Sequence, residues 1–218
     1  MTGFSNSPRL LKGGLILMDQ ASGSVNRVIA LQYNPDQVTR ALQPQSTGGS
    51  AAMSEPMRLK GPPIETIKLD AEIDATDQLE FPDSHAVAVK VGLHPQLAAL
   101  ETIVYPDSET LIHNNQLANA GMLEIVPVQA PLLLFVWSKE RVVPVRITDF
   151  SIVEEAFDVN LNPIRARINL GMRVLNINDL GFNDKGGHLF MVYHQQKERL
   201  MTQATSAALA SLGLGALP

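Results

Sequence analysis

The chain has 218 residues, enough for one sizeable hydrophobic core or for one core with a small appendage. Apolar residues make up 45% of it and charged residues 18%, so it has enough apolar material for a core and a surface poorer in charge than an average soluble domain. The net charge of −5, with scattered basic residues, gives no sign of nucleic-acid binding. Cysteine is absent, which excludes disulfides, zinc–thiolate sites and cysteine nucleophiles.

No segment has the pattern of a targeting or membrane-spanning sequence. Residues 1–11 lack a basic stretch followed by a long apolar run, so we expect a protein made in the cytoplasm without a signal peptide. The most apolar window, residues 122–137, is too short to span a bilayer and is interrupted by Glu124 and by Pro127 and Pro131. We therefore expect no membrane insertion.

The N-terminal part predicts a mobile start followed by a hairpin. Residues 1–12 are polar, and residues 15–18 and 28–33 are short apolar strand candidates. Residues 19–26 between them are rich in Gly, Ser and Asn, which is typical of a turn. The Asn-Pro-Asp sequence at 34–36 ends the second strand, because proline supplies no backbone donor.

Residues 43–63 form the clearest break in the pattern. They are low in hydrophobicity and end in Gly-Pro-Pro, which predicts a long loop or partly disordered arm. A linker between two domains is the alternative, but the 42 residues before it hold too little apolar material to fold alone. We therefore predict a single domain over residues 13–212 with a frayed tail at 213–218.

The middle of the chain predicts a strand and then helix. Residues 65–74 alternate between apolar and polar side chains, as in a half-exposed strand. Residues 83–104 have a helical apolar stripe, but Gly92 and Pro95 interrupt it, so two short helices are the alternative. Residues 105–120 are polar and irregular, with at most a helical turn.

The second half is rich in strands and ends in a helix. Four strands are predicted, at residues 123–127, 131–137, 142–159 and 164–175, and polar turns separate the last three from one another. Residues 189–212 have helical spacing. The last strand gives the strongest signal, because eleven residues alternate strictly and no helix with a coherent face has that period. At about 3.3 Å per residue it spans roughly 35 Å. Its predicted inward residues are Ile164, Ala166, Ile168, Leu170, Met172 and Val174.

These elements predict an α+β fold dominated by antiparallel sheet, with one or two helices packed on it. By analogy with tail-tube proteins, we expect the sheet to form a sandwich or an open barrel. That step rests on analogy alone.

No motif for catalysis, cofactor binding or metal binding emerges. The five histidines lack ligand spacing, and neither a nucleophile elbow, a Walker A loop nor a Rossmann fingerprint occurs. The acids Asp70, Glu72 and Asp74 occupy the polar side of one strand. A solvated strand face explains them more simply than a catalytic pair of carboxylates does. Glu154 and Glu155 point to opposite faces if their strand is regular. We therefore predict no catalytic, cofactor-binding or metal-binding residue and no enzyme activity.

Four residues are candidates for an assembly interface. Trp137 ends an apolar strand, where it serves either as a core or sheet-edge aromatic or as an interface anchor. Arg165, Arg167 and Arg173 occupy the polar side of the last strand. A long alternating strand can extend a sheet across subunits, so these side chains are expected to contact neighbouring copies.

An ordered set of segments resembles a known family. Residues 29–36 (Ile-Ala-Leu-Gln-Tyr-Asn-Pro-Asp) resemble an early strand and turn of contractile injection system proteins. Residues 131–137, 141–148, 157–166 and 173–175 then follow in the order of the family called contractile injection system tube protein. This is the core domain of the LysM-carrying baseplate adaptor of phage-tail-like particles. The resemblance covers about residues 12–200, and no LysM segment follows before Pro218, so no LysM-dependent contact is expected.

The resemblance implies a structural function. Members of this family join the spike and hub to the inner tube and the baseplate wedges, in a particle that stays in the cytoplasm or is released. It further implies a homo-oligomeric ring, a hexamer by family resemblance, and no cofactor. Two alternatives remain: an inner tube or tube-initiator protein of the same particle, and a hydrolase without a recognisable motif.

Overall fold

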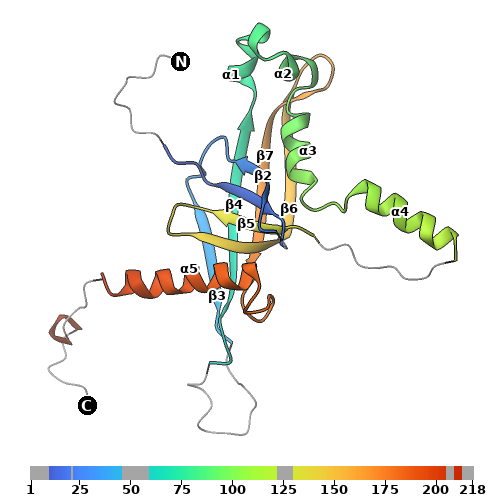
Figure 1. Cartoon of the computed structure of the whole chain (residues 1–218). Coiled ribbons are helices and arrows are strands. Elements are labelled where there is room, and N and C mark those ends of the chain that lie inside the picture. Colours follow the sequence, from blue (N-terminus) through green and yellow to red (C-terminus); the bar gives the residue numbers. More distant parts are fainter. Residues whose placement is uncertain (1–9, 21, 46–58, 122–129, 205–208, 213–218) are drawn as a thin grey trace.

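The computed structural model describes residues 10–20, 22–45, 59–121, 130–204 and 209–212. Its seven strands form one antiparallel sheet in the order β2-β1-β5-β6-β7-β4-β3 (Figure 1). The strands are β1 (Gly14–Met18), β2 (Val25–Ala30), β3 (Val38–Gln43), β4 (Ile64–Asp74), β5 (Leu132–Val136), β6 (Val142–Phe157) and β7 (Pro163–Val174).

The helices lie around this sheet in two groups. The first group follows β4, and α5 crosses the opposite end of the sheet (Figure 1). The helices are α1 (Thr76–Leu79), η1 (Pro82–Ser84), α2 (Ala86–Val91), α3 (His94–Glu101), α4 (Ser108–Asn119), α5 (Lys185–Met201) and η2 (Leu209–Leu212).

The strand β7 is the centre of the sheet. It pairs with β6 on one side and with β4 on the other, and the alternation predicted from its sequence matches its burial. Its inward residues Ala166, Ile168 and Leu170 join a core that α3 and α5 also enter. Leu93, Leu97 and Leu100 come from the α3 segment, and Phe190 and Tyr193 come from α5.

The predicted α+β class with an antiparallel, strand-rich sheet is confirmed. All seven strands of the described residues belong to one sheet, so no second sheet forms a sandwich with it there, and the sheet is not closed into a barrel. Its ends nevertheless approach each other: the amide of Gln32, just after β2, accepts from the backbone N–H of Asp74 at 3.0 Å and donates to its carbonyl at 2.7 Å.

The structure corrects several of the predicted elements in the first half. The strand β3 was not predicted and precedes the arm expected at 43–63, of which residues 46–58 lie outside the described part. The single helix over residues 83–104 is wrong, because the chain breaks between α2 and α3. Gly92 makes this break at φ +56°, and a Cβ there would lie 2.5 Å from the carbonyl oxygen of Pro163.

The second half differs at α4 and α5. The segment predicted to be irregular holds the twelve-residue helix α4, none of whose residues is buried, and Asp107 caps it by accepting from the N–H of Thr110. The terminal helix α5 begins four residues earlier than predicted, since the buried Gly186 and Gly187 let its first turn approach neighbouring segments. The mobile start over residues 1–9, the strand at 123–127 and the tail at 213–218 lie outside the described residues.

Replacing Ile168 with Asp should prevent folding. Ile168 is 2% exposed in the middle of β7, so a carboxylate there would be buried without a partner. We expect a loss of at least about 4 kcal/mol from the free energy of unfolding, comparable with the whole stability of many domains. Circular dichroism and urea titration measure this effect. The control is Thr39→Asp, an exposed change opposite Lys68 on β4 that should leave folding intact.

Candidate assembly surface

The three arginines predicted for an interface lie along β7 on the face of the sheet opposite the core. Each has an acidic partner on a neighbouring element. The Arg165 guanidinium lies 2.8 Å from Asp74 and 3.6 Å from Glu72 on β4, and Arg167 lies 3.5 Å from Glu155 on β6. Arg167 is 65% exposed, against 43% for Arg165, so Arg167 is the better placed of the two to reach another molecule.

The ion pair at Arg165 ties β7 to β4. Burial by itself would raise the pKa of Asp74, but hydrogen bonds from Thr76 and Arg165 outweigh it and lower that pKa. The same contact raises the pKa of the Arg165 guanidinium. Arg165 therefore has a stabilising contact within the chain in addition to any contact in an assembly.

Arg173 lies near the other end of β7. It pairs across the strands with Arg146 of β6 and donates from Nη2 to Asp179 at 2.7 Å. Its Nε is buried and has no hydrogen-bond partner among the described residues. Arg173 therefore has one donor that the described contacts do not use. An unpaired buried donor costs free energy, so a contact in an assembly that used it would be favourable.

Trp137 directly follows β5, whereas the three arginines lie on β7. Its ring stacks on that of Phe135 with centroids 6.0 Å apart, and it packs against the core while remaining half-buried. Gly13 leaves room for it, because a Cβ there would lie 2.5 Å from the indole ring. This packing is the core or sheet-edge arrangement considered from the sequence, and an interface role stays a prediction.

Sequence reasoning did not identify the free edges of the sheet. The strand β5 pairs only with residues 142–145 of β6, so residues 146–157 pair on one side only within the described chain. Residues 70–74 of β4 likewise extend beyond β3. The ends of β6, β7 and β4 therefore form a three-stranded arm whose β6 edge is open, while Gln32 occupies the β4 edge at Asp74 (Figure 1). Open edges present unpaired N–H and C=O groups that pair readily with another chain.

The far end of this arm is apolar and acidic. The turn after β6 lies against the α2–α3 junction, where Asn162 donates to the carbonyl of Lys90 at 3.2 Å. Six large apolar side chains at this end are at least 44% exposed: Phe81, Val87, Val89, Phe157, Val159 and Leu161. Residues 70–91 and 150–168 carry nine acidic and three basic residues, a net charge of −6 against −5 for the whole chain. Exposed apolar side chains gathered in this way mark an interaction surface.

A buried carboxylate fixes α5 at the opposite end. Glu65 of β4 is 3% exposed and binds three side chains, which come from β3 and α5. Lys197 donates to it at 3.0 Å, Tyr193 at 2.9 Å and Arg40 at 2.9 Å. Burial alone would raise the pKa of Glu65, but Lys197, Tyr193 and Arg40 outweigh it, so the pKa is lowered. Burial and the charge of Glu65 raise the pKa of the Tyr193 hydroxyl.

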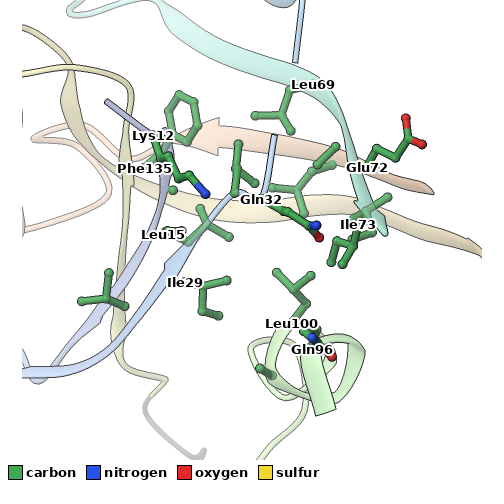
Figure 2. A pocket seen from close by; sticks show the side chains of 18 of the residues that line it. Lys12, Leu15, Ile29, Gln32, Leu69, Glu72, Ile73, Gln96, Leu100 and Phe135 are labelled. Carbon is green, nitrogen blue, oxygen red and sulfur yellow. The ribbon is translucent and has the colours of Figure 1, made fainter. Parts of the chain in front are cut away.

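One cavity of about 480 Å³ lies between β1, β2, β4, β7 and α3 (Figure 2). Leu15, Leu69 and Phe135 are among its mostly apolar lining residues. In the part of the chain that the structure describes, five groups have shifted pKa values, and none of them lines this cavity. A hydrolase pocket would gather such groups, so this cavity lends no support to the hydrolase alternative.

Among the described residues, no group of three or more His, Asp or Glu side chains is arranged to hold a metal ion. None of the described helices is long and apolar enough to cross a membrane.

Comparisons with known proteins give only distant matches. No protein-family model matches the chain, and no curated protein matches it significantly. Among solved structures, the tail of an empty GTA particle with C6 symmetry covers 75% of this chain and 90% of its own, with 14% identity and a TM-score of 0.28. The virion of a native gene transfer agent particle covers 74% of this chain and 90% of its own, with 14% identity and a TM-score of 0.26. Similarity at this level establishes neither a shared fold nor a shared role.

Replacing Glu65 with Gln should destabilise the protein by about 1–3 kcal/mol at neutral pH, because Arg40 and Lys197 lose the carboxylate between them. Folding lowers the pKa of Glu65, so its stabilisation is present above the ordinary value of 4.5 and is lost as pH falls through the lowered value. Urea unfolding at pH 7 and at pH 3 measures both effects. Glu65→Gln should show a flatter pH dependence than the wild type.

The matched control is Glu198→Gln on α5, whose side chain is 62% exposed beside His194. It should change stability by less than about 0.5 kcal/mol. Equal stabilities of wild type and Glu65→Gln at pH 7 would contradict a stabilising role for the buried carboxylate.

Proposed function

We propose that the chain is a structural subunit of a phage-tail-like contractile injection particle. It would act as a baseplate adaptor that joins the spike and hub to the inner tube and the baseplate wedges. The observation that carries this proposal is the three-stranded arm, which combines an open β6 edge with an exposed apolar end. A monomer that worked alone would gain nothing from leaving these surfaces uncovered.

The sequence resemblance supports this function at specific places in the fold. Its segment 131–137 covers β5, and 141–148 covers the start of β6. The segment 157–166 forms the turn into β7, and 173–175 lies at the end of β7. The resemblance therefore falls on the central strands of the sheet and on the turn at the tip of the arm.

The open edges support a ring of identical copies. Residues 146–157 of β6 offer twelve residues for pairing with the sheet edge of a neighbouring copy. Such a contact joins two different surfaces, so it closes into a ring when the rotation between copies permits. Six copies is the number implied by the family resemblance.

The end of the arm supports a contact with a different protein of the particle. Its apolar residues lie among uncompensated acids such as Asp77, Glu80 and Asp83, so a complementary partner presents a basic rim around an apolar centre. The hub, spike, tube and wedge proteins are the candidates that the proposed function supplies.

An inner tube or tube-initiator protein is the second candidate. The feature that favours it is the exposed side of α5, where His188, Val192 and Arg199 form a stripe at the end opposite the arm, with Arg199 3.8 Å from Glu140. Contact between this stripe and the acidic end of another copy would repeat along one axis. Such a contact produces filaments, whereas an adaptor stops at one ring.

Electron microscopy of the purified protein at its highest soluble concentration tests the two candidates. We expect discrete rings, because at high concentration the β6 edges of neighbouring copies pair while the acidic end of the arm stays free. Long tubes would contradict the adaptor function and favour the tube protein. A monomer at every concentration, measured by sedimentation velocity, would contradict assembly through the sheet edges.

Replacing Arg167 with Glu should weaken this assembly and leave the monomer folded. The new carboxylate would lie beside Glu155 and opposite Glu72, on a side chain position that is 65% exposed, so its cost within the monomer is at most about 1 kcal/mol. Sedimentation velocity should show a smaller fraction of rings than for the wild type. The control Lys139→Glu, an exposed change in the β5–β6 turn, should assemble normally. Normal rings from Arg167→Glu would make Arg167 an ordinary solvated residue.

Site-specific photo-crosslinking should separate the two kinds of contact. Benzoylphenylalanine placed at Val153 on the arm should crosslink to another copy of this chain within an assembled particle. The same group at Val159, which is 98% exposed at the tip, should crosslink to a protein of different mass. Mass spectrometry of the products identifies each partner. A self-crosslink at Val159 would contradict a heterologous contact at the tip.

A further inference from the structure

The helix α4 is fully exposed and yet has the composition of an interface. None of its residues is buried, and the large apolar side chains of Leu111 and Ile112 are 51% and 58% exposed. Glu109 is its only acidic residue and it has no Lys or Arg, whereas α5 has four such charged residues among its 17. A helix face in contact with water is normally rich in charge, and depletion of charge is typical of interface cores. A helix of twelve residues is also only marginally stable on its own in water.

The last turn of α5 is exposed in a similar way. The Tyr193 hydroxyl donates to Glu65 of β4 at 2.9 Å and accepts from Arg40 of β3 at 3.2 Å, which holds α5 at the β3 edge of the sheet. The next described residues include 198–201, and all four of these are exposed. Two of the four are large and apolar, and the more exposed of them is Met201 at 69%. The last turn of α5 therefore has no buried face in the single copy.

The two helices project from opposite edges of one half of the sheet. The strand order β6-β7-β4-β3 places β6 at one edge of this half and β3 at the other. The segment that leads into α4 lies beside β6, because Val104 and Tyr105 line one surface hollow together with Phe150 and Ile152. Figure 1 shows α4 leading away from the sheet on this side and α5 extending past β3 on the other. Both α5 and α3, which precedes α4, pack in one core, so both helices leave the same face of the sheet.

We propose that α4 of one copy packs against the last turn of α5 in the next copy. The contact rests on the proposed function, in whose ring the β6 edge of one copy meets the β3 edge of its neighbour. Since α4 runs away from β6 and α5 runs away from β3, the two helices meet antiparallel. The first turn of α4, which carries Glu109, then lies beside the last turn of α5, which carries Arg199. Opposite charges at this point favour the contact.

The lengths of the elements allow this contact. Four strands about 4.8 Å apart give a repeat of roughly 19 Å per copy along the sheet. At 1.5 Å per residue, the twelve residues of α4 span about 18 Å, which is about one repeat. The residues of α5 beyond Tyr193 reach about 12 Å from the other side. Leu111 and Ile112 then cover the apolar end of α5, which removes apolar surface of both copies from water.

Cysteine cross-linking tests the contact directly, because the chain has no cysteine of its own. Full-length Ile112→Cys with one affinity tag is mixed with Met201→Cys with another, allowed to assemble and treated with a short bismaleimide cross-linker. We expect at least about fivefold more dimer with both tags than from Ile112→Cys mixed with Val159→Cys, because contact raises the effective concentration of the two thiols. The control position Val159 is 98% exposed, so random collision would favour the control.

Replacing Ile112 with Asp should weaken assembly and leave the monomer folded, since this side chain has no buried contact in the single copy. Sedimentation velocity should show the midpoint concentration for assembly raised at least about tenfold, because the contact would remove the new carboxylate from water. The control Val159→Asp should leave that midpoint unchanged. Circular dichroism confirms that each variant is folded.

The outcomes separate the helix contact from the proposed function. Rings that give no excess of the Ile112–Met201 dimer, or an unchanged midpoint for Ile112→Asp, would overturn the helix contact and leave the ring standing. A protein that stays monomeric at every concentration would overturn both. Long tubes that give the excess dimer would support the helix contact and contradict the baseplate function.

Discussion

The strand β7 is the element on which the rest of the structure depends. It pairs over its length with β6 and over most of it with β4, and its inward side chains from Ala166 to Val174 are buried. A shift of register by one residue would turn that apolar row to solvent and bring the polar row, including Arg167, into the core. The register of the sheet centre is therefore strongly specified, and the ion pair of Arg165 with Asp74 is compatible with this register alone.

The unequal lengths of the strands generate the assembly surfaces. The strands β6 and β7 have 16 and 12 residues, whereas β5 and β1 have five each, so the central strands must extend beyond their neighbours. The inner face of this extension belongs to the core, because Ala166 and Ile168 pack there in one cluster with the leucines of the α3 segment. The outer edge stays open, and the apolar residues at the tip stay exposed. These are the properties expected of a subunit whose stability as a monomer and whose contacts in an assembly come from different parts of the same strands.

The sequence allowed the fold class and the sheet centre to be predicted, because strict alternation has one structural explanation. It did not reveal β3, whose segment lacks a clean alternation, or the length of α4, whose few apolar residues are not buried. The arginines of β7 were identified by their place on the polar face, but their acidic partners depend on the register with β4 and β6. The role of Glu65 was likewise hidden, because an acid in an alternating strand has no sequence signal for burial against a helix 128 residues away. Free edges are a property of strand order, which a single sequence does not encode locally.

The open edges and the cavity have one physical origin. A sheet that closed into a barrel would pair β2 with the opposite end and remove both the edges and the gap between them. Here a side chain bridges the two sides, since Gln32, just after β2, makes the two backbone contacts to Asp74 of β4 that a neighbouring strand would otherwise make. This contact fixes the separation of the two sides without joining them. The cavity beneath it exists because the curvature stops short of closure.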